Sequence, residues 1–541
     1  MQFIYFYLIS YSIIGYGILL SRYLDLKKYN FGYLGFLGLT LFLIISFFSS
    51  LILKHNYFFN SFFLIVGLFL FLFQIFKINN LKKNILNHFI IFSLLLVFVM
   101  IAKNHDDFHY YHFPYMSLLT EFNHPFGLGL LNNGFRSPSS LFFIGSMFYL
   151  PGVSIYVFHI TSALILGFSN LILLEKIFDK ETFKSYKFIN FLSLISFIFI
   201  NIFFYRLAEY GTDRSGMLIV IIAIISFLTV INFKNENQEY EIKFLILSLC
   251  FAITLKPFYL INIPLILLLL FYEKTRNIFL NLFFTRIFWY CLFLIFFIIF
   301  YTFINSGCLF FPLSITCVQN LPWSIDLEKV DDVKTWFELW SKAGASPNYI
   351  VEDRYSYISN FNWLSNWINQ YFFNKFSDFL LGLFLLLLII LSVFKNDLIH
   401  ISKKNIRFAY LYFLIICFLI EWFSFHPALR YGGYHLVFLT IFIPFSVFLD
   451  KFDIDFKIFK KKAFILIIVT IIIFSFRNIH RLSKEYAKYE YNPIIDLNYK
   501  FIGASADFHY RYNKRLREKF SNYNSFKFLG KKFIYLSREN Y

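Results

Sequence analysis

The sequence has little charge for its length. Of its 541 residues, only 15% are Asp, Glu, Lys or Arg, whereas 59% are hydrophobic. A soluble domain carries about 25% charged residues, because most of its surface faces water. The composition therefore excludes an ordinary soluble protein and predicts a chain that is largely surrounded by lipid.

Cysteine is also scarce, and the five cysteines form no Cys-x-x-Cys motif for metal binding or redox chemistry. Cys250, Cys291 and Cys417 lie in apolar runs, where a thiol packs as a small hydrophobic group. Cys308 and Cys317 share one loop. They could form a disulfide if that loop lies in an oxidising compartment, or remain free thiols if it does not.

No nucleic-acid-binding signature accompanies the net charge of +18. The basic residues fall mostly in short segments between apolar runs, which is how the orientation of a membrane protein is encoded. We therefore expect the lipid bilayer, and no nucleic acid, as a partner.

What the chain does contain is a series of long apolar runs. A helix needs about 20 apolar residues to cross the hydrocarbon core of a bilayer. Runs of that length or slightly shorter predict an all-α polytopic integral membrane protein with about 14 spans. They are 3–20, 34–53, 58–76, 85–102, 153–174, 188–204, 216–231, 244–255, 258–272, 287–304, 377–394, 408–422, 434–449 and 463–476.

The number of spans becomes 13 if 244–255 and 258–272 form one helix that is kinked at Pro257. That arrangement would place Lys256 near the bilayer centre, at a cost of about 2.5–3.5 kcal/mol. Two short helices that turn at Lys256 avoid this cost, so we favour the hairpin. The apolar segment 141–150 is too short to span and is expected to lie in the interface or to dip back.

The distribution of Lys and Arg tests this threading. No positive charge precedes the first run, while Arg22, Lys27 and Lys28 follow it, which predicts an uncleaved span with its N-terminus outside. The predicted inner loops then hold 24 basic residues and the much longer outer loops hold 12. This bias supports the threading. The tail, 477–541, holds the other 14 basic residues and is placed outside by parity alone.

The richest chemistry lies just after the fourth run, in the segment 104–114 with the sequence NHDDFHYYHFP. Titratable groups are tolerated where a helix leaves the lipid and are costly inside it. A carboxylate there can accept a proton from a hydroxyl group. We therefore predict Asp106 and Asp107 as catalytic residues, with His109 and His112 in contact with substrate.

A metal site in this segment is an alternative. His105, His109 and His112 follow a spacing that places them on one face of a helix, which is compatible with metal ligation. Glu121 and His124 are further candidate ligands. The histidines could instead bind lipid headgroups or substrate, so no cofactor is certain and a divalent metal is possible.

Other loops predicted on the same side carry further charges. The segment 205–214 supplies a second acidic group, Glu209 and Asp213, together with Arg206 and Arg214. These four residues could also form a plain surface cluster of ion pairs.

Lys256 and Arg430 are isolated cations at predicted helix ends. They either extend toward the interface, as long cationic side chains do, or bind phosphate. Tyr431 is expected to contact substrate, and so is Trp323. The loop 305–376 that contains Trp323 holds five of the seven tryptophans, which suggests a stacking surface over a sugar.

Together these motifs resemble the GT-C superfamily of multi-pass glycosyltransferases that use polyprenyl-phosphate-linked sugars. The similarity rests on Asp106-Asp107 after an early span, the second acidic loop 209–213, and a Gly-x-x-x-x-Pro turn at 307–312 before the long loop. It covers roughly residues 85–450. The segments 107–114 and 321–323 resemble a poorly characterised bacterial branch. Three extra spans precede the acidic loop, and no Trp-Trp-Asp signature of oligosaccharyltransferases is present.

The resemblance implies a GT-C-like helical core with long extracytoplasmic loops in a bacterial cytoplasmic (inner) membrane. It divides the chain into extra N-terminal spans (1–84), a core (85–304) with the acidic loop 103–140, a large loop (305–376), C-terminal spans (377–476) and the tail (477–541).

The implied reaction moves a sugar from a polyprenyl-phosphate donor to an extracytoplasmic glycan or lipid acceptor, with inversion. The acceptor is expected in cell-envelope polysaccharide synthesis. Asp106 or Asp107 would act as the base, and Arg430, Lys256, Arg206 and Arg214 would stabilise the departing phosphate. The alternatives are a flippase or transporter of lipid-linked glycans, and a polysaccharide polymerase or ligase.

Overall fold

The computed structural model describes residues 1–541 except 27–29, 79, 102–106, 154, 210, 234–237, 347–350, 396–405, 491, 493–503, 521–522, 529–530 and 541. His105 and Asp106 therefore lie outside the described residues, and the roles predicted for them remain predictions.

The described part of the chain is nearly all-α, as expected of a multi-pass membrane protein. Ten helical segments in it are long and apolar enough to cross a membrane. They are α1 (Gln2–Tyr23), α2 (Phe31–Ile52), α3 (Tyr57–Gln74), α4 (Leu81–Met100), α7 (Ile160–Ile177), α8 (Lys180–Phe203), α9 (Thr212–Asn232), α13 (Arg286–Ser306), Leu364–Phe394, which includes α16 (Leu364–Trp367) and α17 (Ser377–Phe394), and α20 (Phe456–Tyr489).

The other four predicted runs are helical as well. They correspond to α10 (Gln238–Leu255), the segment Pro257–Phe271 that includes α11 (Ile263–Leu267), α18 (Ala409–Phe425) and α19 (Gly433–Leu449). The run at 153–174 begins as turns, and α7 starts only at Ile160. The count of 14 spans stays a prediction, while the nearly all-α architecture with many apolar helices agrees with a multi-pass membrane protein.

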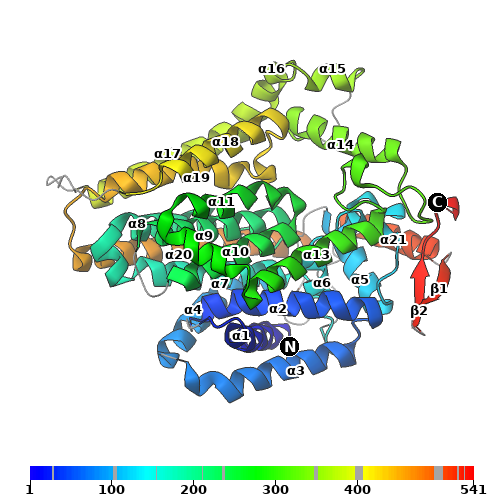
Figure 1. Cartoon of the computed structure of the whole chain (residues 1–541), viewed down its shortest axis with the longest axis horizontal. Helices are drawn as coiled ribbons and strands as arrows, with labels where there is room; N and C mark the ends of the chain where they lie inside the picture. The colour runs from blue at the N-terminus through cyan, green and yellow to red at the C-terminus, as the bar shows by residue number, and fades with distance from the viewer. Residues whose placement is uncertain are drawn as a thin grey trace.

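The long helices lie side by side, and α14 (Leu327–Lys342), α15 (Arg354–Ile358), α21 (Ala504–Phe520) and the strands β1 (Asn524–Phe528) and β2 (Lys531–Tyr535) lie toward one end (Figure 1). Buried residues make up 94% of the apolar stretch of α9, but only 22% of that of α3. Phe58 and Phe69 of α3 are 89% and 66% exposed. Apolar side chains that nothing in the protein covers are suited to contact with lipid.

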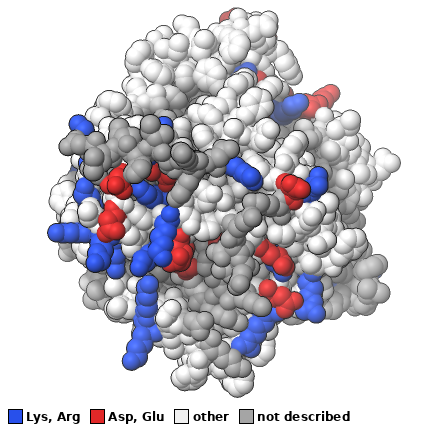
Figure 2. Space-filling view, turned by 60° about the vertical axis from the view of Figure 1, so that its left-hand side comes forward, with Lys and Arg blue, Asp and Glu red and all other residues white. Residues whose placement is uncertain are grey.

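One end of the bundle collects loops that are predicted to lie inside. The Lys187 ammonium donates to the carbonyl of Phe452 (2.7 Å), and Lys243 donates to the carbonyl of Leu24 (3.4 Å). Arg407 pairs through its backbone with the side chain of Asn232. Lys and Arg side chains gather on this end, with carboxylates between them (Figure 2). The predicted inner loops are therefore neighbours in space.

The opposite end collects the loops that are predicted to lie outside, including the tail. The backbone of Phe126 exchanges hydrogen bonds with Ile534 and Leu536, at 2.9 and 3.0 Å, and Arg538 donates to the carbonyl of Pro322 (2.7 Å). The tail thus lies beside the acidic loop, as parity predicts. The antiparallel pairing of β1 and β2 departs from the all-α expectation.

The short apolar segment 141–150 neither spans the bundle nor lies at its outer edge. It starts as α6 (Ser140–Ser146), every residue of which is buried, and α6 packs against α2 and α5 (Phe113–Glu121). Helix α6 thus packs against the helix that directly follows the acidic segment.

Cys308 and Cys317 form a disulfide, whereas Cys250, Cys291 and Cys417 are free thiols. Structural disulfides persist in oxidising compartments.

We predict that a polyethylene-glycol maleimide adds three groups to the denatured, unreduced protein isolated from cells. Reduction before labelling should raise this to five groups, as read from the mass shift. Five groups without reduction would contradict the disulfide. It would also weaken the assignment of the loop 305–376, which contains both cysteines, to the outside.

Two histidines, His55 and His124, lie in loops at the end of the bundle that carries the acidic loop. We expect them to make the stability of the protein depend on pH. Burial lowers the pKa of His55 and of His124 to about 3. His55 bonds to Ser49 and Ser146 (2.9 and 2.7 Å), and His124 to the Tyr115 hydroxyl (2.8 Å). Below pH 6.5 the unfolded chain binds protons at these rings and the folded protein does not, so the free energy of unfolding decreases as pH falls.

Each histidine can contribute at most about 1.4 kcal/mol per pH unit. We expect the melting temperature of the detergent-solubilised protein to fall between pH 6.5 and pH 5. The fall should be smaller in a His124→Gln variant, whose amide oxygen can still accept from Tyr115. Equal slopes in the two proteins would show that His124 is not held neutral.

Candidate functional site

Asp213 lies at the centre of a charged cluster at the end of the bundle that carries the acidic loop. Lys256 forms an ion pair with Oδ1 of Asp213, and the Nε atom of Arg430 lies 3.2 Å from Oδ2. The Nη2 atom of Arg430 lies 3.3 Å from Oδ2 of Asp107. Four charges from four distant segments therefore alternate in sign along one connected group.

The turn after α10 fixes Lys256. Helix α10 ends at Leu255, and Lys256 is extended (φ −158°, ψ 127°), because proline disfavours the helical conformation in the residue before it. The hydroxyl of Tyr259 donates to the backbone carbonyl of Asp213. Gly216 makes this possible, since a Cβ there would collide with the Tyr259 ring. The helix thus breaks at Lys256-Pro257, as the predicted turn requires, while the hairpin of two spans stays a prediction.

Arg430 is held by the short connection between α18 and α19. It lies in a single 3₁₀ turn, Leu429–Tyr431, which ends at Gly432 with φ +99°. Only glycine adopts this conformation readily, and a Cβ on Gly432 would also meet the ring of Phe258 at 2.7 Å. The tight turn brings Arg430 and Tyr431 together onto the cluster.

Aromatic rings cover the two cations. The Arg430 guanidinium lies 5.4 Å from the ring centre of Trp340, and the Lys256 ammonium lies 5.0 Å from that of Tyr431. The rings of Trp340 and Tyr431 also contact each other, with 5.5 Å between their centres. Trp340 comes from α14 in the tryptophan-rich loop, so part of the predicted stacking surface does reach the site.

The cluster is partly open to water. The side chains of Arg430, Lys256 and Asp107 are 35%, 32% and 27% exposed, whereas Asp213 is only 11% exposed. Burial by itself would lower the pKa of Arg430, but Asp213, Tyr431 and Asp107 raise it above its ordinary value. Arg430 is therefore a permanent cation, and Asp213 is the buried anchor that holds both cations in place.

The second acidic loop is divided between two places. Asp213 joins the cluster, but Glu209 binds Arg206 through two contacts (2.9 and 2.6 Å) and also pairs with Arg481 of α20. Arg214 lies over the rings of Phe204 and Tyr434. Of the four cations predicted to bind phosphate, only Lys256 and Arg430 converge, while Arg206 and Arg214 are engaged elsewhere.

The described part of the acidic segment is not a regular α-helix throughout. Asp107 precedes a π-helical turn, Phe108–His112, and the side chains of His109 and His112 within this turn are buried. The ring of His112 packs on Phe142 (4.9 Å). Among the described residues no group of three His, Cys, Asp or Glu side chains is placed to hold a metal ion. The candidate ligand His105 lies outside the described residues, so the metal site stays a prediction.

Trp323 lies away from the cluster. It packs against Phe126 (5.4 Å) and Tyr535 (6.3 Å), so it supports the contact between the loop and the tail. Trp340 and Tyr259 were not predicted as site residues. The only sequence signal for Trp340 was its place in the tryptophan-rich loop, and no sequence signal points to Tyr259.

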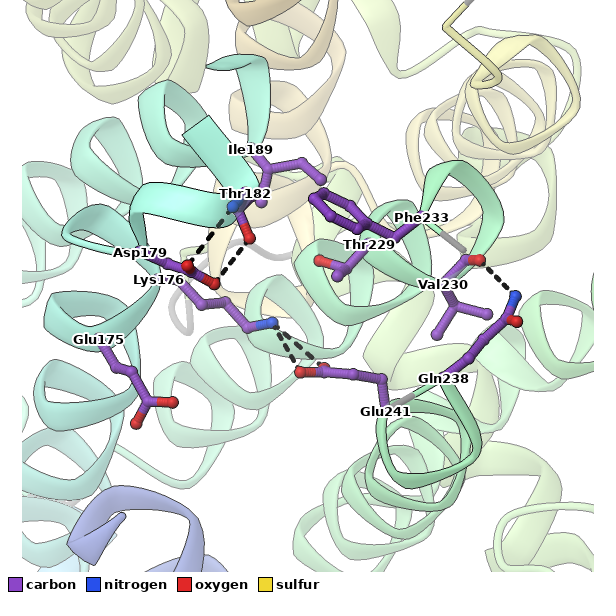
Figure 3. Close-up of a pocket in the computed structure, with 10 residues that line it drawn as sticks. All are labelled: Glu175, Lys176, Asp179, Thr182, Ile189, Thr229, Val230, Phe233, Gln238 and Glu241. Atoms are coloured by element: carbon purple, nitrogen blue, oxygen red, sulfur yellow. Dashed lines mark hydrogen bonds and ion pairs between the residues drawn. The ribbon is translucent and has the colours of Figure 1, made fainter. Parts of the chain in front are cut away.

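A separate small cavity of about 60 Å³, with the lining residues of Figure 3, lies where α7 and α9 end and α8 and α10 begin. Asp213 and Lys256 lie at the other ends of α9 and α10. At the cavity, Lys176 donates to both carboxylate oxygens of Glu241 (3.2 and 3.1 Å), and Asp179 accepts from Thr182. These polar groups satisfy one another. Because the cavity lies at the other end of the bundle, it is not part of the charged cluster around Asp213.

Comparison with known proteins adds one relationship. Searches among curated proteins and among solved structures found no match. The profile of a protein family matches residues 1–438, which include Asp107, Asp213, Lys256 and Arg430 but neither α20 nor the tail. Because this match covers more than half of the chain, the protein belongs to that family, which is described as a domain of unknown function, DUF8201.

Proposed function

We propose that the protein is a membrane glycosyltransferase that moves a sugar from a polyprenyl-phosphate donor to a glycan or lipid acceptor outside a bacterial cytoplasmic membrane. The observation that carries this proposal is the cluster in which Lys256 and Arg430 converge with Asp107 and Asp213. A carboxylate beside fixed cations offers both a proton acceptor and a phosphate site.

In the proposed reaction, Asp107 or its neighbour Asp106 accepts the proton of an acceptor hydroxyl. The hydroxyl oxygen bonds to the anomeric carbon, and the bond from that carbon to the phosphate oxygen breaks with inversion. The phosphate leaves with the bonding electron pair and needs no proton. Lys256 and Arg430 stabilise its charge, which is a large catalytic effect when the donors are already in position.

Asp213 has a supporting role in this proposal. It contacts both cations and is less exposed than either, so it orients them before the donor binds. Arg430 also contacts Asp107. A donor phosphate that draws Arg430 toward itself would weaken this contact and leave Asp107 free to accept a proton.

Orientation supports an outside reaction. The cluster lies at the end of the bundle that carries the Cys308–Cys317 disulfide, and the basic loops favour the cytoplasm for the other end. Nucleotide sugars are not available outside the membrane, so a lipid phosphate has to deliver the activated sugar.

Proteoliposomes that contain a labelled polyprenyl-phosphate sugar test the proposal. With envelope glycan added on the side of the cluster, we expect the label to move to the glycan and polyprenyl phosphate to be released. Movement of the intact sugar lipid across the bilayer, with no transfer under any acceptor condition, would overturn the proposal in favour of a flippase.

A further inference from the structure

The helix α21 of the tail lies against the acidic segment. It packs on the turn Phe108–His112, which directly follows Asp107. Arg517 of α21 fixes the helix to α5 through the Ser117 hydroxyl and the Glu121 carboxylate, at 2.6 Å each. Phe520 at its end packs on Phe122 (4.7 Å). The tail thus borders the site, although it lies beyond the segment matched by the family.

The second half of α21 has a buried side and a basic side. Asn513, Leu516 and Phe520 are buried, at the i, i+3 and i+7 spacing of one helical face. The opposite face is exposed and carries four basic residues and one acidic residue: Arg511, Lys514, Arg515, Lys519 and Glu518. We call these five residues the basic face of α21.

Membrane orientation does not explain this charge. Cationic residues favour cytoplasmic loops, yet the tail lies with the predicted outer loops and holds 14 basic residues, against 12 in all those loops together. The surface of α21 is therefore more basic than the other segments at this end.

We propose that the basic face of α21 binds an anionic acceptor glycan, one that carries carboxylate or phosphate groups, and holds it at the end of the bundle that carries Asp107. This inference rests on the proposed function, which it deepens by giving the charge class of the acceptor. An extended polyanion matches exposed cations gathered on one helical face, such as Lys514 and Arg515, and such binding weakens as salt screens the charges.

Binding can be measured without any transfer reaction. The full-length protein in phosphatidylcholine nanodiscs should bind oligogalacturonate, a carboxylated probe, and should not bind a neutral maltooligosaccharide of similar length. The double variant Lys514→Gln/Arg515→Gln should weaken oligogalacturonate binding at least about fivefold. Raising the salt concentration should also weaken the binding of oligogalacturonate by the unmodified protein.

The matched control removes the same charge from the other end of the bundle. Lys457→Gln/Lys460→Gln changes two exposed lysines at the start of α20, and this variant should bind oligogalacturonate as the unmodified protein does. Equal binding by the α21 double variant, or equal binding of the neutral probe, would overturn the inference. So would a double variant that loses only its association with phosphatidylglycerol vesicles, because the face would then serve lipid.

The two proposals fail in different ways. An Asp107→Asn variant should keep oligogalacturonate binding while it loses transfer. Transfer that depends on Asp107 but not on the α21 face would overturn only this inference. Binding that depends on the face, in a protein that transfers no sugar, would overturn only the proposed function.

Discussion

Replacement of Asp107 by Asn should slow sugar transfer by about a hundredfold or more, while the protein still inserts and folds. A positioned general base contributes about 10²–10⁴ to rate, and Asn cannot accept the proton. The Asp107 side chain is 27% exposed and forms an ion pair with Arg430 at 3.3 Å, and Asn has nearly the same size, so the substitution should disturb the fold little. The measurement is transfer by purified protein at saturating donor.

A matched control is Asp332→Asn, which removes an exposed carboxylate from α14 at the same end of the bundle. Its transfer rate should equal that of the unmodified protein. Asp106→Asn should be measured in parallel, because the sequence offers both neighbours as the base. If both the Asp106 and the Asp107 variants keep full activity, the base lies elsewhere and the proposed chemistry is wrong.

Replacement of Arg430 by Gln should have the second large effect, a loss of about 10²–10³ in the rate of transfer. The variant removes one of the two cations proposed to stabilise the departing phosphate, and it takes from Asp107 and Asp213 a cation with which both form ion pairs. We also expect destabilisation of about 1–3 kcal/mol from the lost contacts. Transfer rates should therefore be compared at a temperature well below the melting transition of the variant.

The Arg430→Lys variant separates charge from geometry. It keeps the cation but cannot contact Asp107 and Asp213 with two different nitrogens, as the guanidinium does. Its activity should lie between that of Arg430→Gln and that of the unmodified protein. Arg354→Gln, an exposed arginine in α15, should change nothing. An Arg430→Gln variant with unimpaired transfer would remove Arg430 from the mechanism.

The sequence predicted the architecture well because lipid imposes simple rules. Apolar length identified helices at all fourteen runs, and the cost of a lysine at the bilayer centre correctly favoured a turn at Lys256. The charge bias separated the loops into two sets that the hydrogen bonds of the structure also separate, with Lys187 and Phe452 at one end and Arg538 and Pro322 at the other.

The site was predictable only in part. Asp107, Asp213, Lys256 and Arg430 all stood out as charges at helix ends, and they do meet. Which charges pair with which depends on the packing of helices far apart in the sequence. Arg481, on α20, forms an ion pair with Glu209. The sequence of the loop 205–214 by itself does not indicate that contact. The sequence also did not predict the π-helical turn Phe108–His112, which contains two of the three histidines of the predicted face, His109 and His112.

The tail shows the other limit. Hydropathy says nothing about a polar segment, and neither α21 nor the hairpin of β1 and β2 was predicted. Their placement depends on contacts between segments far apart in the sequence, such as that of Phe126 with Ile534 and Leu536 and that of Arg517 with Glu121. These contacts place α21 beside the turn that follows Asp107.

Electron cryo-microscopy of the protein in nanodiscs with bound polyprenyl phosphate, the leaving group of the proposed reaction, tests the central claim most directly. We predict phosphate density within hydrogen-bonding distance of Lys256 and Arg430, with the prenyl chain running into the bilayer beside it. Phosphate bound at the Arg206–Glu209–Arg481 group, or in the cavity beside Lys176 at the opposite end, would contradict the account.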